Sequence, residues 1–479
     1  MNTKKNFIRV LIFGFLTTVL IHSCKVGPNF EKSDVPAQAT FRYDSLMTDT
    51  VVNLQWWNLF NNSELDSLIY IGLNENKDVL TAASRVQQAM ITVGFTKVDL
   101  YPQFGVTANA NLGNVLGNNP LGSDKGVYMG GLSMNWEIDF WGKYRRATEA
   151  ARANYVASEY AQRTVQIGLI TAITKTYFQL LDYNTRLAIS MNTLNSRQRA
   201  VDIIGARFEQ GIVPAIDLNQ AKIQLAIAKS SVPFFERQIA TTETSLAVLL
   251  GISPYKLGFN TSLMDQAYPE DIPPGLPSTL LERRPDIIAA ENKYHAEVAN
   301  IGVAEAQRFP SISLTGLAGG LASQELSAAV TGSFAWSASA GLLSPLINWG
   351  KNKKRAEIQR EVALQSAYAY ENTVLQAFKE VDDALITIRT LKAEVDARGE
   401  QVEAAVSARN LSQERYDGGV TSYLEVIDND RAAFDAELKF IETRQKLLNS
   451  YILFYKALGG GWITPEEEET ANDAAQQNQ

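Results

Sequence analysis

The chain contains one sequence pattern twice, and the two copies are separated by a constant offset of 208 residues (286 − 78). Six pairs of matching residues or short motifs share this offset: Asp78 and Asp286, Tyr101-Pro102 and Phe309-Pro310, Trp141-Gly142-Lys143 and Trp349-Gly350-Lys351, Arg207 and Arg415, Gly211 and Gly419, and Leu250-Gly251 and Leu458-Gly459. Solenoid repeats are much shorter, about 20–50 residues. The sequence therefore predicts two large units, with almost no net insertion between them, that build one structure together.

The start of the chain has the pattern of an export signal. Basic residues within the first nine positions precede an apolar run from Val10 to Ile21, which is too short to span a bilayer as a permanent helix. Residues 21–24 (Ile-His-Ser-Cys) have the form of a relaxed lipobox. Cys24 is the one cysteine of the chain and cannot form an internal disulfide. We predict a bacterial lipoprotein with a covalent lipid on Cys24; the alternative is an ordinary signal peptide followed by an incidental cysteine.

Composition argues against nucleic-acid binding and against catalysis. The formal net charge is −8, and removal of residues 1–23 would delete three positive charges and change it to about −11, whereas nucleic acid requires basic faces. Two histidines and one cysteine leave little for a metal site or for a nucleophile paired with histidine. We therefore expect no enzyme, no metal site and no cofactor besides the lipid.

Each copy contains two segments in which apolar and polar residues alternate. Residues 104–112 and 128–140 show this pattern in the first copy, and residues 311–318 and 334–342 show it in the second. Alternation with period two is typical of strands with one apolar face, and tilted strands of about 9–11 residues can cross a bilayer. A soluble sandwich is the alternative. The predicted lipid and the aromatic residues near the strand ends favour the membrane; these aromatics are Tyr101, Phe140, Trp141, Phe309 and Trp349.

After each predicted hairpin the apolar spacing becomes helical. Apolar residues spaced alternately by four and three recur from Ile173 to Val201, and again from Val374 to Ile388. Proline is absent from 143–213 and from 346–464. A helix of about 65 residues is roughly 100 Å long, which is typical of a coiled-coil wall. A plain coiled-coil rod does not explain why strands and helices repeat together.

Four strands cannot close a barrel by themselves. Open strand edges are not tolerated in lipid, so several copies of the chain would be needed. Two copies would give about eight strands with a filled interior, and three would give about twelve with room for water.

Six segments together carry a resemblance to a known family: "CKVGPNF" at 24–30, Trp56-Trp57 with Phe60, "LLERRPDI" at 280–287, "FPSISL" at 309–314, "RYDGGVTSYLEVIDNDR" at 415–431 and "YKALGGGW" at 455–462. Over residues 24–462 the chain resembles the TolC/OprM (NodT-type) outer-membrane efflux lipoproteins. The resemblance implies an α+β membrane protein in which three protomers share a twelve-stranded β-barrel. A long periplasmic α-helical barrel continues it, surrounded by a mixed equatorial domain.

The repeat and the resemblance together predict the domain boundaries. Two features depart from the family, namely the loose lipobox and the run of glutamates at 466–469. The predicted ranges are a lipoprotein signal peptide at 1–23, a lipidated segment at 24–60, repeat 1 at 61–260, repeat 2 at 273–462 and an acidic disordered tail at 463–479. Within the repeats we expect hairpins at about 101–140 and 309–345, and helical hairpins at about 143–250 and 351–458.

The resemblance implies a passive channel in a tripartite pump of the bacterial outer membrane. A periplasmic adaptor (membrane fusion protein) would join the homotrimer to an inner-membrane RND transporter, which would supply the energy for export of drugs or other small molecules. A type I protein-secretion duct has the same fold and remains an alternative, as do a structural coiled-coil lipoprotein and an enzyme. Asn109, Asn135, Glu137 and Asp139 would face a wet lumen that tolerates cations.

The turns between the long and short helices are the predicted docking tips for the adaptor. They contain Arg207 and Gly211 in the first copy, and Arg415, Gly418 and Gly419 in the second. Glycine there permits the positive φ that ends a helix. Simple helix stops would explain the glycines but not the repeated arginine, aromatic and acid.

The predicted periplasmic gate follows the second turn. Leu424 and Asp428 are four residues apart and share a helix face, and Glu425 lies close to it. The resemblance implies that an apolar ring and an acidic ring at these positions narrow the pore and favour cations. The alternative is a solvated helix start, where acids suit the helix dipole.

Overall fold

The computed structural model describes residues 25–33, 56–111, 127–254, 258, 261–269, 283–323 and 333–460. The predicted signal peptide, Cys24 and the predicted acidic tail lie outside the described residues. The chain divides into two compact units: unit 1 comprises Met1–Asp34, Arg85–Glu159 and Ala289–Glu371, and unit 2 comprises Val35–Ser84, Tyr160–Ile288 and Asn372–Gln479.

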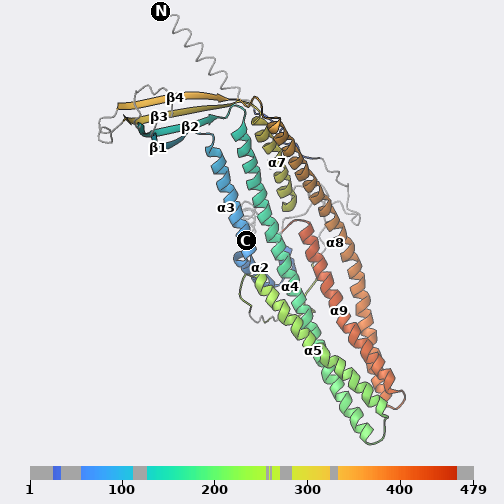
Figure 1. Cartoon of the computed structure of the whole chain (residues 1–479). Helices are drawn as coiled ribbons and strands as arrows, with labels where there is room; N and C mark the ends of the chain where they lie inside the picture. Colours follow the sequence, from blue (N-terminus) through green and yellow to red (C-terminus); the bar gives the residue numbers. More distant parts are fainter. Residues whose placement is uncertain are drawn as a thin grey trace, which may run out of the picture. The chain divides into compact units, whose positions relative to one another are not determined.

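The described elements follow the same order in both halves of the chain, with two helices added at the start of the first (Figure 1). The first half contains the 3-10 helix η1 (Trp56–Phe60), α2 (Ser63–Glu75), α3 (Lys77–Val98), β1 (Gln103–Asn111), β2 (Val127–Ile138), α4 (Lys143–Glu209) and α5 (Ala215–Leu249). The second half contains α7 (Pro285–Ala306), β3 (Ser311–Ser323), β4 (Ser333–Leu343), α8 (Lys351–Asp417) and α9 (Tyr423–Ala457).

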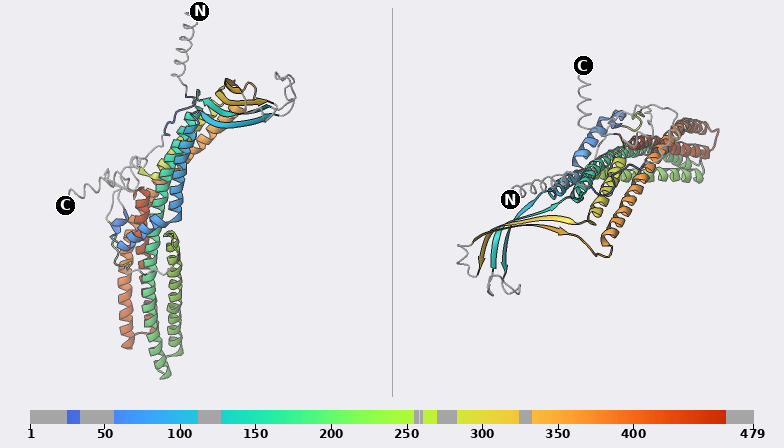
Figure 2. Two further views of the ribbon diagram at one scale, coloured as in Figure 1. Left: turned by 90° about the vertical axis from the view of Figure 1, so that its left-hand side faces the viewer. Right: turned by 90° about the horizontal axis from the view of Figure 1, so that it is seen from above.

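Unit 1 contains one antiparallel sheet of four strands in the order β1-β2-β3-β4. The hairpins β1-β2 and β3-β4 lie within the two ranges expected from the alternating sequence. The structure adds the pairing of β2 with β3, which joins the first half of the chain to the second (Figures 1 and 2). β1 and β4 are left as the edges of this sheet.

The strand register places most of the large apolar side chains on one face of the sheet, although Met129, Leu317 and Leu343 lie on the other. Met134 of β2 lies opposite Phe104 of β1, and Leu132 lies opposite Val106. Across the next pairing Trp136 lies opposite Leu314 of β3. Because side chains alternate along a strand, all of these residues share a face, and the serines, threonines and asparagines occupy the other.

Small residues let the helices of unit 1 pack closely. Ala150 and Ala153 of α4 are buried against Ala296 and Ala299 of α7. Helices approach each other as closely as their contact side chains allow, so four alanines favour a short distance between the axes. The described N-terminal segment is held to α4 by Arg146, whose Nε donates to Val26 O (3.1 Å) and whose Nη2 donates to Gly27 O (3.0 Å).

An aromatic cluster forms the centre of the core in unit 2. Trp56 of η1 is buried and stacks on Tyr455 of α9, with ring centroids 5.7 Å apart. Phe60 packs against Phe178 of α4 at 5.1 Å. The 3-10 helix η1 therefore joins α4 and α9, which are far apart in the sequence. Burial of large aromatic side chains contributes strongly to the stability of a core.

The helix lengths match between the two halves of the chain. α4 and α8 each contain 67 residues, and α5 and α9 each contain 35. The long helices have no proline in their interiors, which would break the backbone hydrogen bonding. Among the helices that the structure describes, none combines the length and apolar character needed to cross a membrane.

A buried ion pair lies within unit 2. The carboxylate of Asp182 accepts a hydrogen bond from Nε of Arg186 at 3.0 Å, and the Arg186 guanidinium lies over the ring of Phe235 at 5.3 Å. Burial raises the pKa of Asp182 to about 6, against the lowering effect of Arg186. The folded protein therefore binds a proton at Asp182 more readily than the unfolded chain does.

This raised pKa predicts that unit 2 loses stability as the pH rises from about 4 to about 6. The contribution is fully present below the unfolded pKa and is lost as the pH passes the folded pKa. Asp182→Asn should remove this dependence when the melting of helical circular dichroism is followed between those pH values. Asp435→Asn is the matched control, because Asp435 also pairs with a cation one turn later but is 60% exposed. A wild-type pH profile for Asp182→Asn would contradict the assignment.

Candidate functional site

The polar face of the sheet contains three of the residues predicted to line a lumen. Asn135 of β2 lies opposite Gln103 of β1 and Thr315 of β3, and Glu137 lies opposite Ser313. Asn109 of β1 is on the same face. The face has hydroxyl and amide groups along it, which can form hydrogen bonds with water.

Two predicted lumen acids have other roles at the end of β2. Asp139 lies beyond the strand, is 8% exposed, and accepts hydrogen bonds from the backbone N–H groups of Tyr144 (3.1 Å) and Arg145 (3.0 Å). It therefore satisfies the first turn of α4, where a negative charge is stabilised. The prediction that Asp139 faces a lumen is corrected. Glu137 keeps its place on the polar face but pairs with Lys143 Nζ at 3.0 Å.

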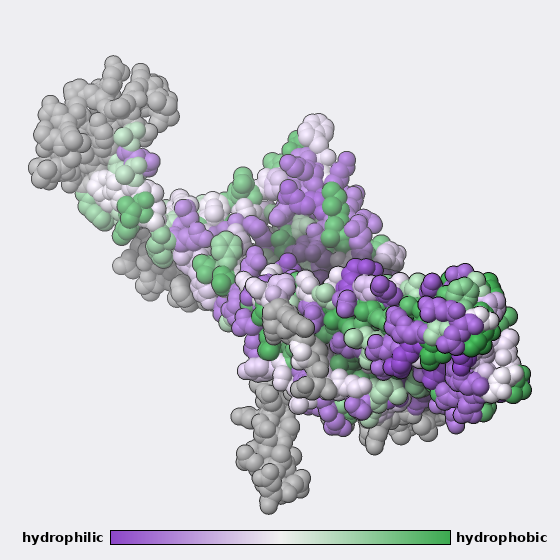
Figure 3. All heavy atoms as spheres, turned by 90° about the horizontal axis from the view of Figure 1, so that it is seen from below, coloured by the Kyte–Doolittle hydropathy of each residue, from purple (hydrophilic) through white to green (hydrophobic). Residues whose placement is uncertain are grey.

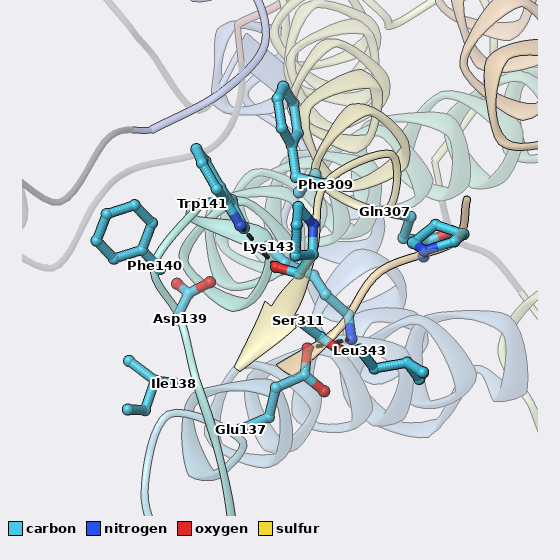
Figure 4. A pocket seen from close by; sticks show the side chains of 13 residues that line it. Glu137, Ile138, Asp139, Phe140, Trp141, Lys143, Gln307, Phe309, Ser311 and Leu343 are labelled. Atoms are coloured by element: carbon cyan, nitrogen blue, oxygen red, sulfur yellow. Dashed lines mark hydrogen bonds and ion pairs between the residues drawn. The ribbon is translucent and has the colours of Figure 1, made fainter. Parts of the chain in front are cut away.

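A cavity of about 370 Å³ at the end of the sheet has aromatic, charged and polar side chains in its lining (Figure 4). Trp141 stacks on Phe309 at 4.6 Å, and Phe140 meets Trp141 edge-on at 4.9 Å. The indole N–H of Trp141 donates to Pro310 O at 2.8 Å. Amphipathic aromatics at strand ends are typical of a membrane–water interface.

The two helical turns have the same backbone geometry, as the repeated glycines predict. Gly211 and Gly419 both have φ of +72°. In the first turn Ile212 N–H donates to Arg207 O at 2.9 Å, and in the second Val420 N–H donates to Arg415 O at the same distance. This is the Schellman arrangement, which requires a residue in the left-handed region.

The arginines of the two turns make different contacts. Arg207 reaches from the first helical hairpin to the second, where Nη2 lies 3.4 Å from Asp417 Oδ1 and the guanidinium lies over the ring of Tyr416 at 5.3 Å. Arg415 remains within its own hairpin, with Nε 3.6 Å from Glu425 Oε1. The arginine of the first turn therefore connects the two turns, whereas the matching arginine of the second turn makes a contact within its own hairpin.

The predicted gate residues lie on the exposed side of α9. Leu424 is 51% exposed, and the Asp428 side chain is 63% exposed and 3.7 Å from Arg431. Glu425 is held within the hairpin, because it accepts a hydrogen bond from Thr421 as well as pairing with Arg415. Leu424 and Asp428 are therefore the more accessible members of the set.

A buried polar link lies on the opposite side of α9, and the sequence analysis missed it. Arg197 of α4 is buried; its Nε donates to Asp430 Oδ2 at 2.8 Å and its Nη1 donates to Gln224 O of α5 at 2.9 Å. The same guanidinium lies over Phe434 at 5.0 Å. One side chain thus joins α4, α5 and α9. The sequence contained one signal for this link: Asp430 and Phe434 are four residues apart, so they share a face of a helix.

Tyr423 adds to this buried face at the start of α9. It packs with Ile204, Ala221 and Ile427. Burial raises the pKa of Tyr423 to about 12, and the neighbouring Tyr416 and Asp430 act in the same direction. The hydroxyl therefore stays neutral at physiological pH. In the part of the chain that the structure describes, no group of three or more His, Cys, Asp or Glu residues could hold a metal ion.

Comparison with known proteins assigns the family. Residues 68–252 and 276–460 both match the family profile described as outer membrane efflux protein. The chain belongs to this family. Its sequence is 31% identical over 474 residues to the probable outer membrane lipoprotein SilC of Salmonella typhimurium, covering 95% of this chain and 99% of that protein. It is 30% identical to the toluene efflux pump outer membrane protein TtgC of Pseudomonas putida, covering 96% and 97%.

Solved structures of outer-membrane channels have the same fold. The channel OprN superposes with a TM-score of 0.84 at 27% identity, covering 92% of this chain and 100% of that one. The open state of MtrE from Neisseria gonorrhoeae gives 0.82 at 28% identity, covering 91% and 98%. The outer membrane efflux protein family consists of channels and not of enzymes. The chain is therefore an outer-membrane efflux channel.

The link made by Arg197 predicts how firmly the start of α9 is held in this channel. Arg197→Met leaves Asp430 without its partner, so amide hydrogen exchange in residues 423–434 should become about tenfold faster, which corresponds to ~1.4 kcal/mol. A double-mutant cycle with Asp430→Asn should give a coupling of about 1–3 kcal/mol. Arg199→Met is the control, because Arg199 is an exposed arginine on the same helix. Equal exchange in the two arginine variants would refute the link.

Proposed function

We propose that three copies of this chain form the outer-membrane channel of a tripartite efflux pump. The observation that carries the proposal is the four-stranded sheet with one apolar face, one polar face and two edges, β1 and β4. In a membrane the unpaired backbone groups of both edges need partners, and β1 of one copy can pair with β4 of the next. Three copies would contribute about twelve strands, enough for a water-filled interior.

Exposed apolar side chains on the helices also support assembly. Ile216, Ile223, Ile227 and Phe234 of α5 are exposed and repeat at helical spacing. On the face drawn in Figure 3, hydrophobic side chains (green) lie among hydrophilic ones (purple) at the surface. Neighbouring copies would cover these side chains and extend the conduit as a helical barrel through the periplasm.

The channel would be passive. Asn135, Thr315 and their neighbours on the polar face would line the lumen and form hydrogen bonds with water and with polar solutes. An inner-membrane RND transporter would supply the energy, and a periplasmic adaptor would connect it to the turns at Gly211 and Gly419. The exported compounds would be drugs or other small molecules, since relatives are named for toluene and cation efflux.

The periplasmic end would be the gate. Leu424 would form an apolar ring and Asp428 an acidic ring, since both are exposed on the protomer. An acidic ring favours cations over anions. The buried link of Arg197 to Asp430, on the opposite side of α9, would fix the position of the helix that carries these residues.

Leu424→Ala combined with Asp428→Ala should therefore increase the single-channel conductance in planar bilayers severalfold and reduce the preference for cations. Cells that carry this variant should become sensitive to large antibiotics such as vancomycin. Leu453→Ala combined with Asp435→Ala is the matched control, since both of those residues are also exposed on α9. A conductance and selectivity equal to wild type would place the constriction elsewhere.

Docking of the adaptor predicts a different phenotype for the turns. Gly211→Asp combined with Gly419→Asp should abolish drug resistance. An added Cβ at either glycine meets open space, so the cost is the backbone strain of aspartate at φ +72°, about 1–2 kcal/mol at each turn, and the yield of trimer should change little. Gly350→Asp is the control for backbone strain, since Gly350 also has positive φ and open space around it but lies outside the two turns. Normal resistance in the double variant would exclude a docking role for these positions.

We also propose that a lipid on Cys24 anchors the mature chain. Cys24 directly precedes Lys25, and the described segment that begins there is bound to α4 by Arg146. An acyl chain at this point would hold the chain at the membrane surface. Metabolic labelling with palmitate should mark the wild type and not Cys24→Ala; equal labelling of the two would exclude the anchor.

A further inference from the structure

Unit 1 contains a second cavity, of about 480 Å³, whose lining is rich in cations. The end of α3, the first turns of α4, the middle of α7 and the N-terminal segment all contribute to it. Its charged and titratable side chains are Lys25, Lys97, Arg145, Arg152, Glu149 and His295. Four permanent cations and one carboxylate therefore line the cavity.

The carboxylate of Glu149 is paired with basic groups of this chain. It accepts contacts from Lys25 Nζ (2.5 Å), Arg146 Nη1 (3.1 Å) and His295 Nε2 (3.3 Å). Burial alone would raise the pKa of Glu149, but the hydrogen bonds from Lys25 and His295 and the charge of Arg146 outweigh it and lower the pKa. Glu149 thus stays ionised and fixes the basic groups around it without neutralising them all.

The other cations leave an excess of positive charge. Arg145 is paired with Asp139, with Nε 3.1 Å from Oδ2. Lys97 and Arg152 are exposed, and neither forms an ion pair with any residue that the structure describes. The ammonium group of Lys97 and the guanidinium group of Arg152 therefore border the cavity and can form hydrogen bonds with an acidic ligand.

The residues next to the cavity in sequence and in space indicate which kind of acidic ligand could bind there. Lys25 is the residue after Cys24, the proposed lipid attachment point. The next residue is tied to the end of the sheet, because Val26 N–H donates to Trp141 O at 3.2 Å. Trp141 belongs to the aromatic group that marks the predicted membrane interface. The basic cavity is thus joined by short covalent and hydrogen-bonded connections to both features that would contact lipid.

We propose that this cavity binds the phosphate of an anionic phospholipid headgroup in the leaflet that holds the Cys24 lipid. The proposal rests on the proposed location of the chain in the outer membrane. Arginine and lysine are suited to phosphate oxygens through charge-assisted hydrogen bonds, and basic pockets at membrane surfaces bind such headgroups. Lys97 and Arg152 would contact the phosphate, and Glu149 would hold Lys25 and His295 in position beside it.

The test compares charge reversals on the same two helices. Lys97→Glu with Arg152→Glu alters the cavity, whereas Arg85→Glu with Arg199→Glu makes the same change of charge on α3 and α4 away from it. The full-length protein would be stripped of lipid in mild detergent, and phosphatidylglycerol binding would be measured by native mass spectrometry. The cavity variant should lose about tenfold or more in affinity, and the control should change by less than about twofold.

Two further ligands identify the source of the phosphate. Zwitterionic phosphatidylcholine should bind clearly more weakly than phosphatidylglycerol, and millimolar inorganic phosphate should not displace the lipid. Equal loss in both charge variants, equal binding of the two lipids, or displacement by inorganic phosphate would each overturn the proposal.

Conductance in planar bilayers separates this site from the channel itself. The cavity variant should conduct as the wild type does, because none of its changed residues lies on the polar face of the sheet or at the turns. Normal conductance together with unchanged phosphatidylglycerol affinity would reject the lipid site alone. Absence of conductance in the wild type would instead reject the proposed channel.

Discussion

The need to satisfy backbone hydrogen bonds at the sheet edges controls the architecture of this protein. β2 and β3 come from different halves of the chain and pair with each other along their length, so the duplicated hairpins form one sheet. β1 and β4 each have a strand on one side only. In water such edges can be solvated, but in lipid they cannot. In the proposed channel, a single protomer would leave both edges unpaired, and pairing of β1 with β4 of another copy would satisfy them.

The helices are under a different constraint, because a helix forms its backbone hydrogen bonds internally and its length is not limited by unpaired edges. What must be specified is how long helices stay in register over 67 residues. Unit 1 uses close contacts between alanines, and unit 2 combines aromatic packing with buried polar links such as Arg197 to Asp430. A buried ion pair adds little net stability compared with apolar packing, but its loss leaves a charge unpaired. Such links therefore favour one axial register of α4, α5 and α9 over registers shifted by a turn.

Local patterns in the sequence predicted the local structure well. Alternation predicted the strands and the apolar face shared by Phe104 and Met134, the absence of proline predicted uninterrupted helices, and Gly211 predicted positive φ. Patterns could not predict which side chains meet across long separations. Asp139 continued the polar alternation of β2 but caps α4, and Arg197 looked like one more charge on a long helix. Those roles depend on tertiary contacts that have no periodic signature.

Duplication also explains how one repeated motif acquired two roles at the turns. Both turns have the same Schellman geometry, so their backbones are equivalent. Yet Arg207 contacts Asp417 in the other hairpin, whereas Arg415 contacts Glu425 in its own. The second copy therefore has its acid at position 425 engaged and its acid at position 428 exposed, and the first copy provides the arginine that holds the two turns together. The copies therefore differ in side-chain contacts on a shared backbone: the first turn supplies a contact to the other hairpin, whereas the arginine of the second turn contacts only its own hairpin.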